Sequence, residues 1–329
     1  MADAPLITSE DFDALEPKWL ALWNESLDAT PFHHPAWHRV WLRHFGENTA
    51  PVFLAIRRAE ALIGVAALDM DREEARELGD HNVRDYAGPL AASGEESAVA
   101  AGILEWLRED LTPRVTFWGL ASDTSVAVAL QDPPPGSGWA PATSPEAVCP
   151  GTDLPDDFET FVGALPKHDR HELRRKMRNL EAAGKVTFES LTEPEPVSAA
   201  MDALFDLMRR SRADKAEFLT PTMEAFFRDL AATFAGLGLL RLSKLSLDGT
   251  TAGMTLSFDD GRTLYLYNSG FEPEHSKLAV GLLSKAYAIR EAISLGRRRF
   301  DFLRGEEDYK RRLGGIDRQV VTVTLRDGG

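Results

Sequence analysis

Residues 299–314 read RFDFLRGEEDYKRRLG, and this stretch joins a short apolar strand to a dense polar cluster. Two phenylalanines and a leucine have the bulk that favours a β-strand, and Asp301 among them would need hydrogen-bond partners to tolerate burial. Gly305 permits a sharp turn into a tail of carboxylates, a tyrosine and cations, which can carry protons or bind anions. The stretch therefore predicts one wall of a ligand site, with a solvated strand end as the alternative.

The tail supplies the candidate catalytic groups. We expect Glu306 or Asp308 to act as a general base and Tyr309 as a general acid. Asp301 is a further candidate, although a carboxylate within a strand often only accepts hydrogen bonds from the backbone or from arginine. The sequence leaves open which of the three consecutive acidic residues 306–308 faces the site.

The segment just upstream predicts an anion-binding turn. A strand over residues 262–268 leads through a turn into a helix over residues 280–295, with a glycine in the first turn of that helix. Backbone N–H groups at the start of a helix are free to bind an anion, and the helix dipole favours negative charge there. The residues predicted to bind the donor are Ser269, Gly270, Leu278, Ala279, Val280, Gly281 and Leu282.

Four further residues are candidates for contact with the substrate. His275 lies in the predicted ligand loop, and Arg304 and Lys310 could hold an anionic group. Tyr86 is surrounded by polar residues in the segment HNVRDYAGPL, and we expect it to face a cleft between two domains. An ordinary surface loop is the competing interpretation of that segment.

Three segments of the second half resemble the CelD/BcsL-like group of the GNAT acyltransferase superfamily, which is related to the FemAB-type aminoacyl transferases. They are ELRRKMRNLEAAGKVTFE, LYNSGFEPEHSKLAVGLLSKAYAIREAISLG and FDFLRGEEDYKRRLGG. In the first half, PFHHPAWHRVWLRHFGE and LGDHNVRDYAGPL are similar to the N-terminal region of that group. The resemblance covers most of the chain.

The resemblance implies an α/β (α+β) fold of two tandem GNAT-like domains, each with a mixed, mostly antiparallel sheet flanked by helices. Residues 1–150 would form the first domain, and residues 151–329 would form a complete GNAT domain that ends in a strand over residues 318–325. The implied activity is an N-acyltransferase, in particular an N-acetyltransferase, that transfers an acyl group from acetyl-CoA or another acyl-CoA to an amine. The group's name suggests a role in polysaccharide biosynthesis and a saccharide or other small-molecule acceptor.

One departure from the family pattern keeps other functions open. GNAT enzymes usually carry a [QR]xxGx[GA] loop, whereas this chain has HSKLAVGLL, with a single glycine. An aminoacyl-tRNA donor, as in FemAB-type relatives, is one alternative, and a non-catalytic binding or scaffold protein is another. The density of ionisable residues after Asp301 favours an enzyme over a scaffold.

Composition sets the broader expectations. The chain has 329 residues, 43% of them apolar, a net charge of −15 and one cysteine. The first 150 residues hold 10 Lys and Arg against 24 Asp and Glu, and this acidic half disfavours binding of nucleic acid or an anionic membrane. With one cysteine and no apolar span or secretion signal, we expect a cytoplasmic protein.

The histidines of the first half do not predict a metal site. His34 and His38 are spaced to share one helix face, but neither a cysteine nor a carboxylate with ligand spacing accompanies them. Neighbouring tryptophans indicate a packed amphipathic helix instead, so we expect no metal cofactor.

Overall fold

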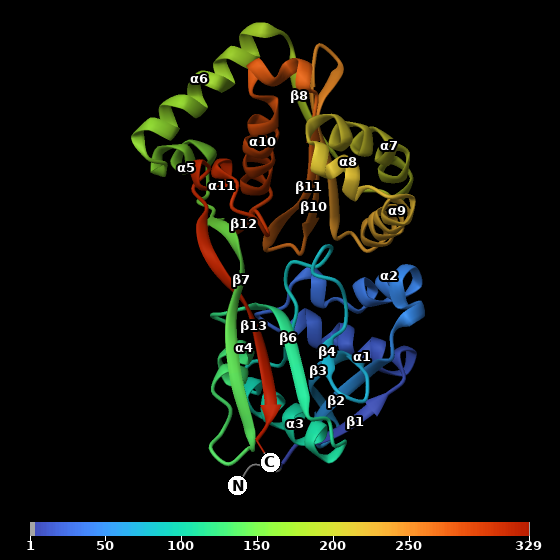
Figure 1. Ribbon diagram of the computed structural model, residues 1–329. Helices are drawn as coiled ribbons and strands as arrows, with labels where there is room; N and C mark the ends of the chain where they lie inside the picture. Colours follow the sequence, from blue (N-terminus) through green and yellow to red (C-terminus); the bar gives the residue numbers. More distant parts are fainter. Residues whose placement is uncertain (1–3, 329) are drawn as a thin grey trace. The chain divides into compact units, whose positions relative to one another are not determined.

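The computed structural model describes residues 4–328, which divide into two compact units (Figure 1). One unit contains the chain up to Val148 together with the C-terminal segment from Arg318, and the other contains Cys149–Asp317. Within residues 4–328, every helix is too short or too polar to cross a lipid bilayer.

The first unit is a mixed, mostly antiparallel sheet covered by helices. Its apolar core lies between strands such as β2 and β3 and the helix α3, where Gly64 leaves no room for a Cβ atom beside Val99. In spatial order the strands are β1 (Leu6–Glu10), β2 (Pro51–Arg58), β3 (Ala61–Met70), β4 (Ala75–Glu77), β6 (Arg114–Ala121), β13 (Ile316–Asp327) and β7 (Trp139–Asp153), and β5 (Leu90–Ala91) also pairs with β3. The helices are α1 (Phe12–Glu25), η1 (Pro31–His33), α2 (Pro35–Phe45), η2 (Gly46–Asn48), α3 (Glu96–Glu109) and α4 (Ser125–Gln131).

The second unit has the same kind of sheet, with α10 (Val280–Ser294) packed on strands β9, β10 and β11. In spatial order its strands are the end of β7, β12 (Arg299–Asp301), β11 (Thr263–Phe271), β10 (Thr250–Asp259), β9 (Leu240–Leu247) and β8 (Val186–Leu191). The remaining helices are α5 (Phe158–Ala164), α6 (Lys167–Ala183), α7 (Pro194–Ser211), α8 (Ala213–Phe218), α9 (Pro221–Gly236), η3 (Pro273–Leu278) and α11 (Asp308–Arg312).

The fold class predicted from the sequence is confirmed, and the antiparallel meander over residues 239–269 forms strands β9, β10 and β11. The turn between β9 and β10 is tight because Asp248 and Gly249 both have positive φ angles, 50° and 83°. Such a pair is typical of the two-residue turns that match the twist of a β-hairpin.

One expectation about the strands was wrong. The final strand does not complete the sheet of the second unit, because β13 pairs antiparallel with β6 of the first unit, with Val320 opposite Ala121. The proline-rich region near residue 150 forms the long strand β7, over residues 139–153. The prolines are compatible with a strand because a residue without an N–H group is tolerated where no ladder bond is needed.

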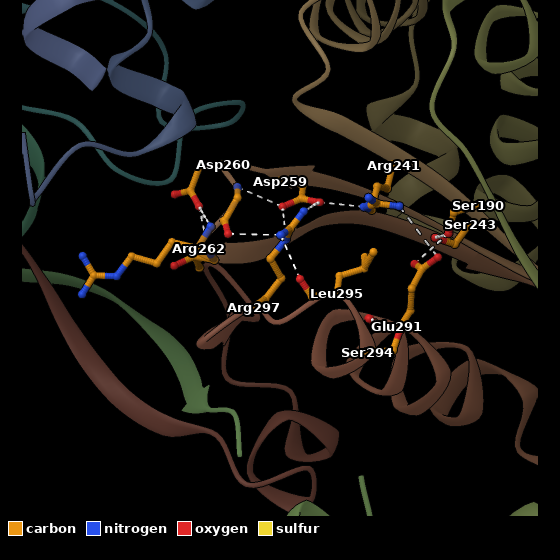
Figure 2. A network of polar contacts seen from close by, with 12 residues as sticks. Ser190, Arg241, Ser243, Asp259, Asp260, Arg262, Glu291, Ser294, Leu295 and Arg297 are labelled. Carbon is orange, nitrogen blue, oxygen red and sulfur yellow. Dashed lines mark hydrogen bonds and ion pairs between the residues drawn. The ribbon is translucent and has the colours of Figure 1, made fainter. Parts of the chain in front are cut away.

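A network of ion pairs stabilises the turn of the β10–β11 hairpin in the second unit (Figure 2). Asp259 is only 4% exposed and accepts hydrogen bonds from Arg241 at 2.6 Å and from Arg297 at 2.7 and 3.0 Å. Arg297 also donates to the carbonyl of Gly261, and Asp260 accepts the hydroxyl proton of Tyr265. The network therefore links β9, the hairpin turn and the segment that leads into β12.

Candidate functional site

The candidate site lies where β11 and β12 part. The two strands run parallel but pair only over Thr263–Tyr265 of β11, opposite the three residues of β12, while β11 continues to Phe271. On the other side of β11 the register with β10 shifts, so that Leu256 faces Asn268 but Ser257 faces Leu266. Such a bulge re-aims the backbone. The edge of β11 beyond residue 265 is therefore not covered by β12.

The chain leaves β12 through a turn that only certain residues can form. Asp301 accepts the N–H of Leu303 at 2.8 Å, and Leu303 has a left-handed φ of 56°. A Cβ atom on Gly305 would lie 2.3 Å from a carboxyl oxygen of Glu307 and 2.9 Å from Nζ of Lys310. Glycine at 305 is thus required for the side chains of the polar tail to fold back over the turn.

Lys310 holds this turn closed. Its side chain is 2% exposed and its Nζ donates to three backbone carbonyls, those of Leu303, Arg304 and Gly305, at 2.9, 2.7 and 3.2 Å. It also lies 3.0 Å from a carboxyl oxygen of Glu307. With these partners Lys310 fixes the loop, which differs from the expectation that it binds an anionic substrate.

Four ionisable side chains gather beside the open edge of β11, and we call Lys215, Lys285, Glu307 and Tyr309 the lysine cluster. Nζ of Lys215, on α8, donates to the carbonyl of Ser269 in β11 at 2.5 Å. Nζ of Lys285, on α10, lies 5.6 Å from the ring centre of Tyr309 on α11. Glu307 is linked to the cluster by Arg212, whose Nη1 is 3.3 Å from its carboxylate.

Burial shifts the pKa values of the two lysines of the cluster toward those needed for proton transfer near neutral pH. Burial, with the nearby charge of Lys215, lowers the pKa of Lys285 to about 7. Burial also lowers the pKa of Lys215 to about 8, with Arg212 as the next cause. Lys285 is 5% exposed, so this α10 ammonium is poorly solvated. At neutral pH a large share of Lys285 is the neutral amine, which can accept a proton.

The other two members of the lysine cluster keep their usual charge states. Burial, and next the charge of Glu307, raise the pKa of Tyr309, so its phenol stays protonated at neutral pH. Burial works to raise the pKa of Glu307, but Lys310 outweighs it and the pKa is lowered. Tyr309 can therefore donate a proton, whereas Glu307 is a weak base held by two cations.

The structure separates the three consecutive acidic residues of the tail. Glu307 is half-buried and belongs to the lysine cluster, while Glu306 and Asp308 are exposed to solvent. Asp308 forms an ion pair with Arg312 at 2.5 Å, one turn along α11. The structure therefore does not bring the two predicted general bases into the cluster, and the one that it brings there is the neighbour between them.

The predicted donor-binding residues lie in two places, the end of β11 and the turn that leads into α10. Ser269 lies at the open edge of β11, and Gly270 packs so closely against α7 that a Cβ atom would lie 2.4 Å from the backbone nitrogen of Met208. Ala279 begins α10 in a left-handed conformation, and its carbonyl accepts the N–H groups of Leu282 and Leu283. Some N–H groups of the predicted anion turn are thus used inside the turn itself.

The remaining predicted residues are more scattered. In the second unit, Leu278 is half-buried, Val280 is buried, and the α carbon of Gly281 faces the ring of Phe271, where a Cβ atom would lie 2.8 Å away. His275 is half-buried in η3, and Arg304 is half-buried just after β12. Tyr86 lies in the loop between β4 and β5, and its side chain is buried, with 2% exposed.

Lys285, Lys215 and Arg212 were missed by the sequence-based reasoning. Lys285 left a signal, because it is a lysine in the apolar run GLLSKAYAI, on a helix whose other faces are also buried. A charge at such a position is rare without a function or a partner. Lys215 and Arg212 left none, since they lie in a polar segment that precedes the site by more than fifty residues.

Three histidines of the first unit, His33, His34 and His38, are buried. His34 accepts the N–H of Ala36 at the start of α2, and burial lowers its pKa to about 4. His33 accepts the N–H of Thr30, and burial lowers its pKa to about 3. Within residues 4–328 no three His, Cys, Asp or Glu side chains are grouped so that they could hold a metal ion.

Comparison with known proteins identifies the second unit. Residues 167–311 match the family model described as "Acetyltransferase (GNAT) domain". This segment is therefore similar to GNAT acetyltransferases. The matched segment contains every member of the lysine cluster, from Lys215 to Tyr309. No protein of curated function matches the sequence significantly.

Solved structures share the fold over nearly the whole chain. The crystal structure of FemX superposes with a TM-score of 0.68 at 10% sequence identity, covering 97% of this chain and 96% of FemX. A conserved protein of unknown function from Bacteroides thetaiotaomicron VPI-5482 gives a TM-score of 0.64 at 10% identity, covering 98% of this chain and 99% of that one. At such low identity these likenesses show a shared fold and no more.

Proposed function

We propose that the protein is an acyl-CoA-dependent N-acyltransferase whose reaction takes place at the lysine cluster of its GNAT domain. The observation that carries the proposal is a buried lysine, Lys285, with a pKa of about 7, beside a protonated tyrosine at the uncovered edge of β11. A neutral amine and a phenol are a matched base and acid for acyl transfer to an amine.

In the proposed reaction, the acceptor amine attacks the thioester carbonyl as Lys285 accepts its proton. The C–N bond forms, the C–S bond breaks, and Tyr309 donates its proton to the leaving thiolate. Backbone N–H groups of β11 near the bulge at 266–268 supply the electrostatic stabilisation that a tetrahedral oxyanion requires. Arg212 and Lys215 add positive charge on the same side of the strand.

The residues present fit an anionic, nucleotide-like donor. Lys285 lies in the second turn of α10, and the N-terminal ends of helices, where the dipole is positive, bind phosphate groups. Gly281 brings the backbone close to Phe271. We extend the proposal to the CelD/BcsL-like group and to a saccharide amine as acceptor, which rest on the sequence resemblance.

Calorimetric titration with acetyl-CoA and with CoA tests the donor. We expect binding in the micromolar range, weakened about tenfold by Arg212→Gln, because a lost charge-assisted contact to phosphate is worth on the order of 1.4 kcal/mol. Arg298→Gln is the matched control. The side chain of Arg298 is 68% exposed and forms an ion pair with the exposed Asp156. Absence of binding to millimolar acetyl-CoA would reject the proposed donor and favour an aminoacyl-tRNA donor or a binding protein.

We expect Tyr309→Phe to reduce kcat by about 10² to 10³, because the leaving thiolate loses its proton donor. The ring contacts of Tyr309 with Phe302, at 6.2 Å between ring centres, should survive in the variant, so the fold should be unchanged. Steady-state rates with acetyl-CoA and a panel of amines measure the effect.

The exposed neighbours of Tyr309 provide the controls. Glu306→Gln and Asp308→Asn should retain more than half of the wild-type rate, because their side chains lie in solvent. If either of these variants lost as much activity as Tyr309→Phe, the assignment of the acid to Tyr309 would be wrong.

A further inference from the structure

The first unit contains a cavity of about 200 Å³ that the proposed acyl transfer does not use. Its walls come from the segment between α1 and the end of η1, the β5 region, the start of α3, the end of β6, and α4, together with Arg318 near the start of β13. All of these belong to the first unit. Three polar side chains of its lining, Thr30, His33 and Tyr86, are less than 10% exposed.

The cavity has an apolar interior. Leucine side chains at 90 and 120 and the methyl groups of Ala91 and Ala121 line it, and all four are buried. Leu27 at the rim is 74% exposed, an unusual state for a leucine. Ligand sites are typically concave, mostly apolar and fitted with few polar groups, and this volume is sufficient for a molecule of about ten non-hydrogen atoms.

Negative charge dominates the rim. Asp28 and Glu96 line the cavity, and Asp123 lies close enough to act on Asp28. The only lysine or arginine among the described residues that line it is Arg318, and this guanidinium already donates to Asp123 at 2.7 Å. Arg318 also lies 5.5 Å from the ring centre of Tyr86. Two carboxylates therefore line the cavity together with one arginine, whose charge is shared with Asp123.

His33 contributes no compensating charge. Its Nδ1 accepts the N–H of Thr30 at 3.1 Å, and burial together with Arg84 lowers its pKa to about 3, so the ring is neutral at physiological pH. Asp28 is exposed at the rim, where Arg318 and the N–H of Ser125 also act on it. Carboxylates at the mouth of an apolar cavity attract a cation.

We infer that this cavity binds a small organic cation. The cation has an ammonium group attached to an apolar body of about six to ten carbon atoms. The ammonium lies between Asp28 and Glu96 at the rim, and the apolar body occupies the interior beside Leu90 and Leu120. The acidic first half of the chain raises the local concentration of cations and discriminates against anionic analogues. The inference does not depend on the acyltransferase activity of the second unit.

Calorimetric titration of the full chain with 3-phenylpropylammonium, 3-phenylpropanol and 3-phenylpropanoate tests this inference. These probes share one apolar body and differ in the charge of one terminal group. We expect the cation to bind at least about tenfold more tightly than the alcohol, since one charge-assisted contact is worth on the order of 1.4 kcal/mol, and we expect the carboxylate not to bind. Hexylammonium is a second cationic probe. Equal binding of the three phenylpropyl probes would overturn the inference, and so would the absence of binding of both cations at 10 mM.

Variants place the site. Asp28→Asn should weaken binding of the cation at least about tenfold and leave binding of the alcohol unchanged. Asp132→Asn is the control, because Asp132 is exposed in the same unit and does not line the cavity. Ser93→Trp, at an exposed position on the rim, should block all probes. If the cation binds Asp28→Asn and Ser93→Trp as it binds the wild type, while their melting temperatures are unchanged, the site is elsewhere and the inference fails.

Discussion

Lys285→Met should lower kcat/KM for acyl transfer by about 10² to 10⁴, the largest loss that we expect from any single substitution in the lysine cluster. Methionine has nearly the same length and apolar stem, so it fills the volume of the buried side chain but cannot accept a proton. In the wild type, kcat/KM should rise with pH through the pKa of Lys285, which is about 7, because only the neutral amine acts as the base. This acidic limb should disappear from the residual rate of the variant.

Stability provides the control for Lys285→Met. The folded-state pKa of Lys285 lies below the ordinary value of 10.5, so the unfolded chain binds its proton more tightly than the native protein between these two pH values. The lysine therefore destabilises the fold at neutral pH, and the methionine variant should unfold at a higher urea concentration than the wild type. A variant that is more stable, yet transfers acyl groups within threefold of the wild-type rate, would show that Lys285 is not the base.

The elements of the fold could be predicted where local pattern and tertiary environment agree. The β9–β11 meander has alternating apolar residues and Asp-Gly turns, and α10 has apolar residues on a helical period, so both were identified. The pairing of the last strand could not be predicted in the same way. Residues 316–327 have an alternating pattern that fits any sheet edge, and nothing in it distinguishes β6 from a strand of the second unit.

The site could be located from the sequence only approximately. The tail after β12 was identified because ionisable residues gather there, and Tyr309 and Glu307 do lie in the cluster. The direction of each side chain depends on the left-handed turn at Leu303 and on Gly305, which reverse the chain before α11 begins. A pattern of consecutive Glu, Glu and Asp contains no information about that reversal. Lys215 comes from α8, and only tertiary contacts bring it to Ser269.

Asp259→Asn should destabilise the second unit by about 2 to 4 kcal/mol, the largest stability effect that we expect from a single substitution. The buried carboxylate of Asp259 is the common acceptor of Arg241 and Arg297, whose side chains are 17% and 19% exposed. An asparagine retains the shape but leaves two guanidinium groups facing a neutral amide. Urea unfolding, followed by intrinsic fluorescence, measures the difference from the wild type.

The pH dependence of that difference identifies its origin. Burial works to raise the pKa of Asp259, but the hydrogen bonds from Arg297 and Arg241 outweigh it, and the folded-state pKa lies below the ordinary 3.8. A carboxyl with a lowered pKa stabilises the fold fully above its unfolded pKa and loses this contribution as pH falls through the folded pKa. The gap between wild type and Asp259→Asn should therefore be constant from pH 8 to about pH 5 and shrink below about pH 4. Asp156→Asn, which removes a carboxylate that is 91% exposed, should change stability by less than about 0.5 kcal/mol at every pH. A gap that stayed the same at pH 3 would mean that lost packing, rather than lost charge, explains the effect of the asparagine.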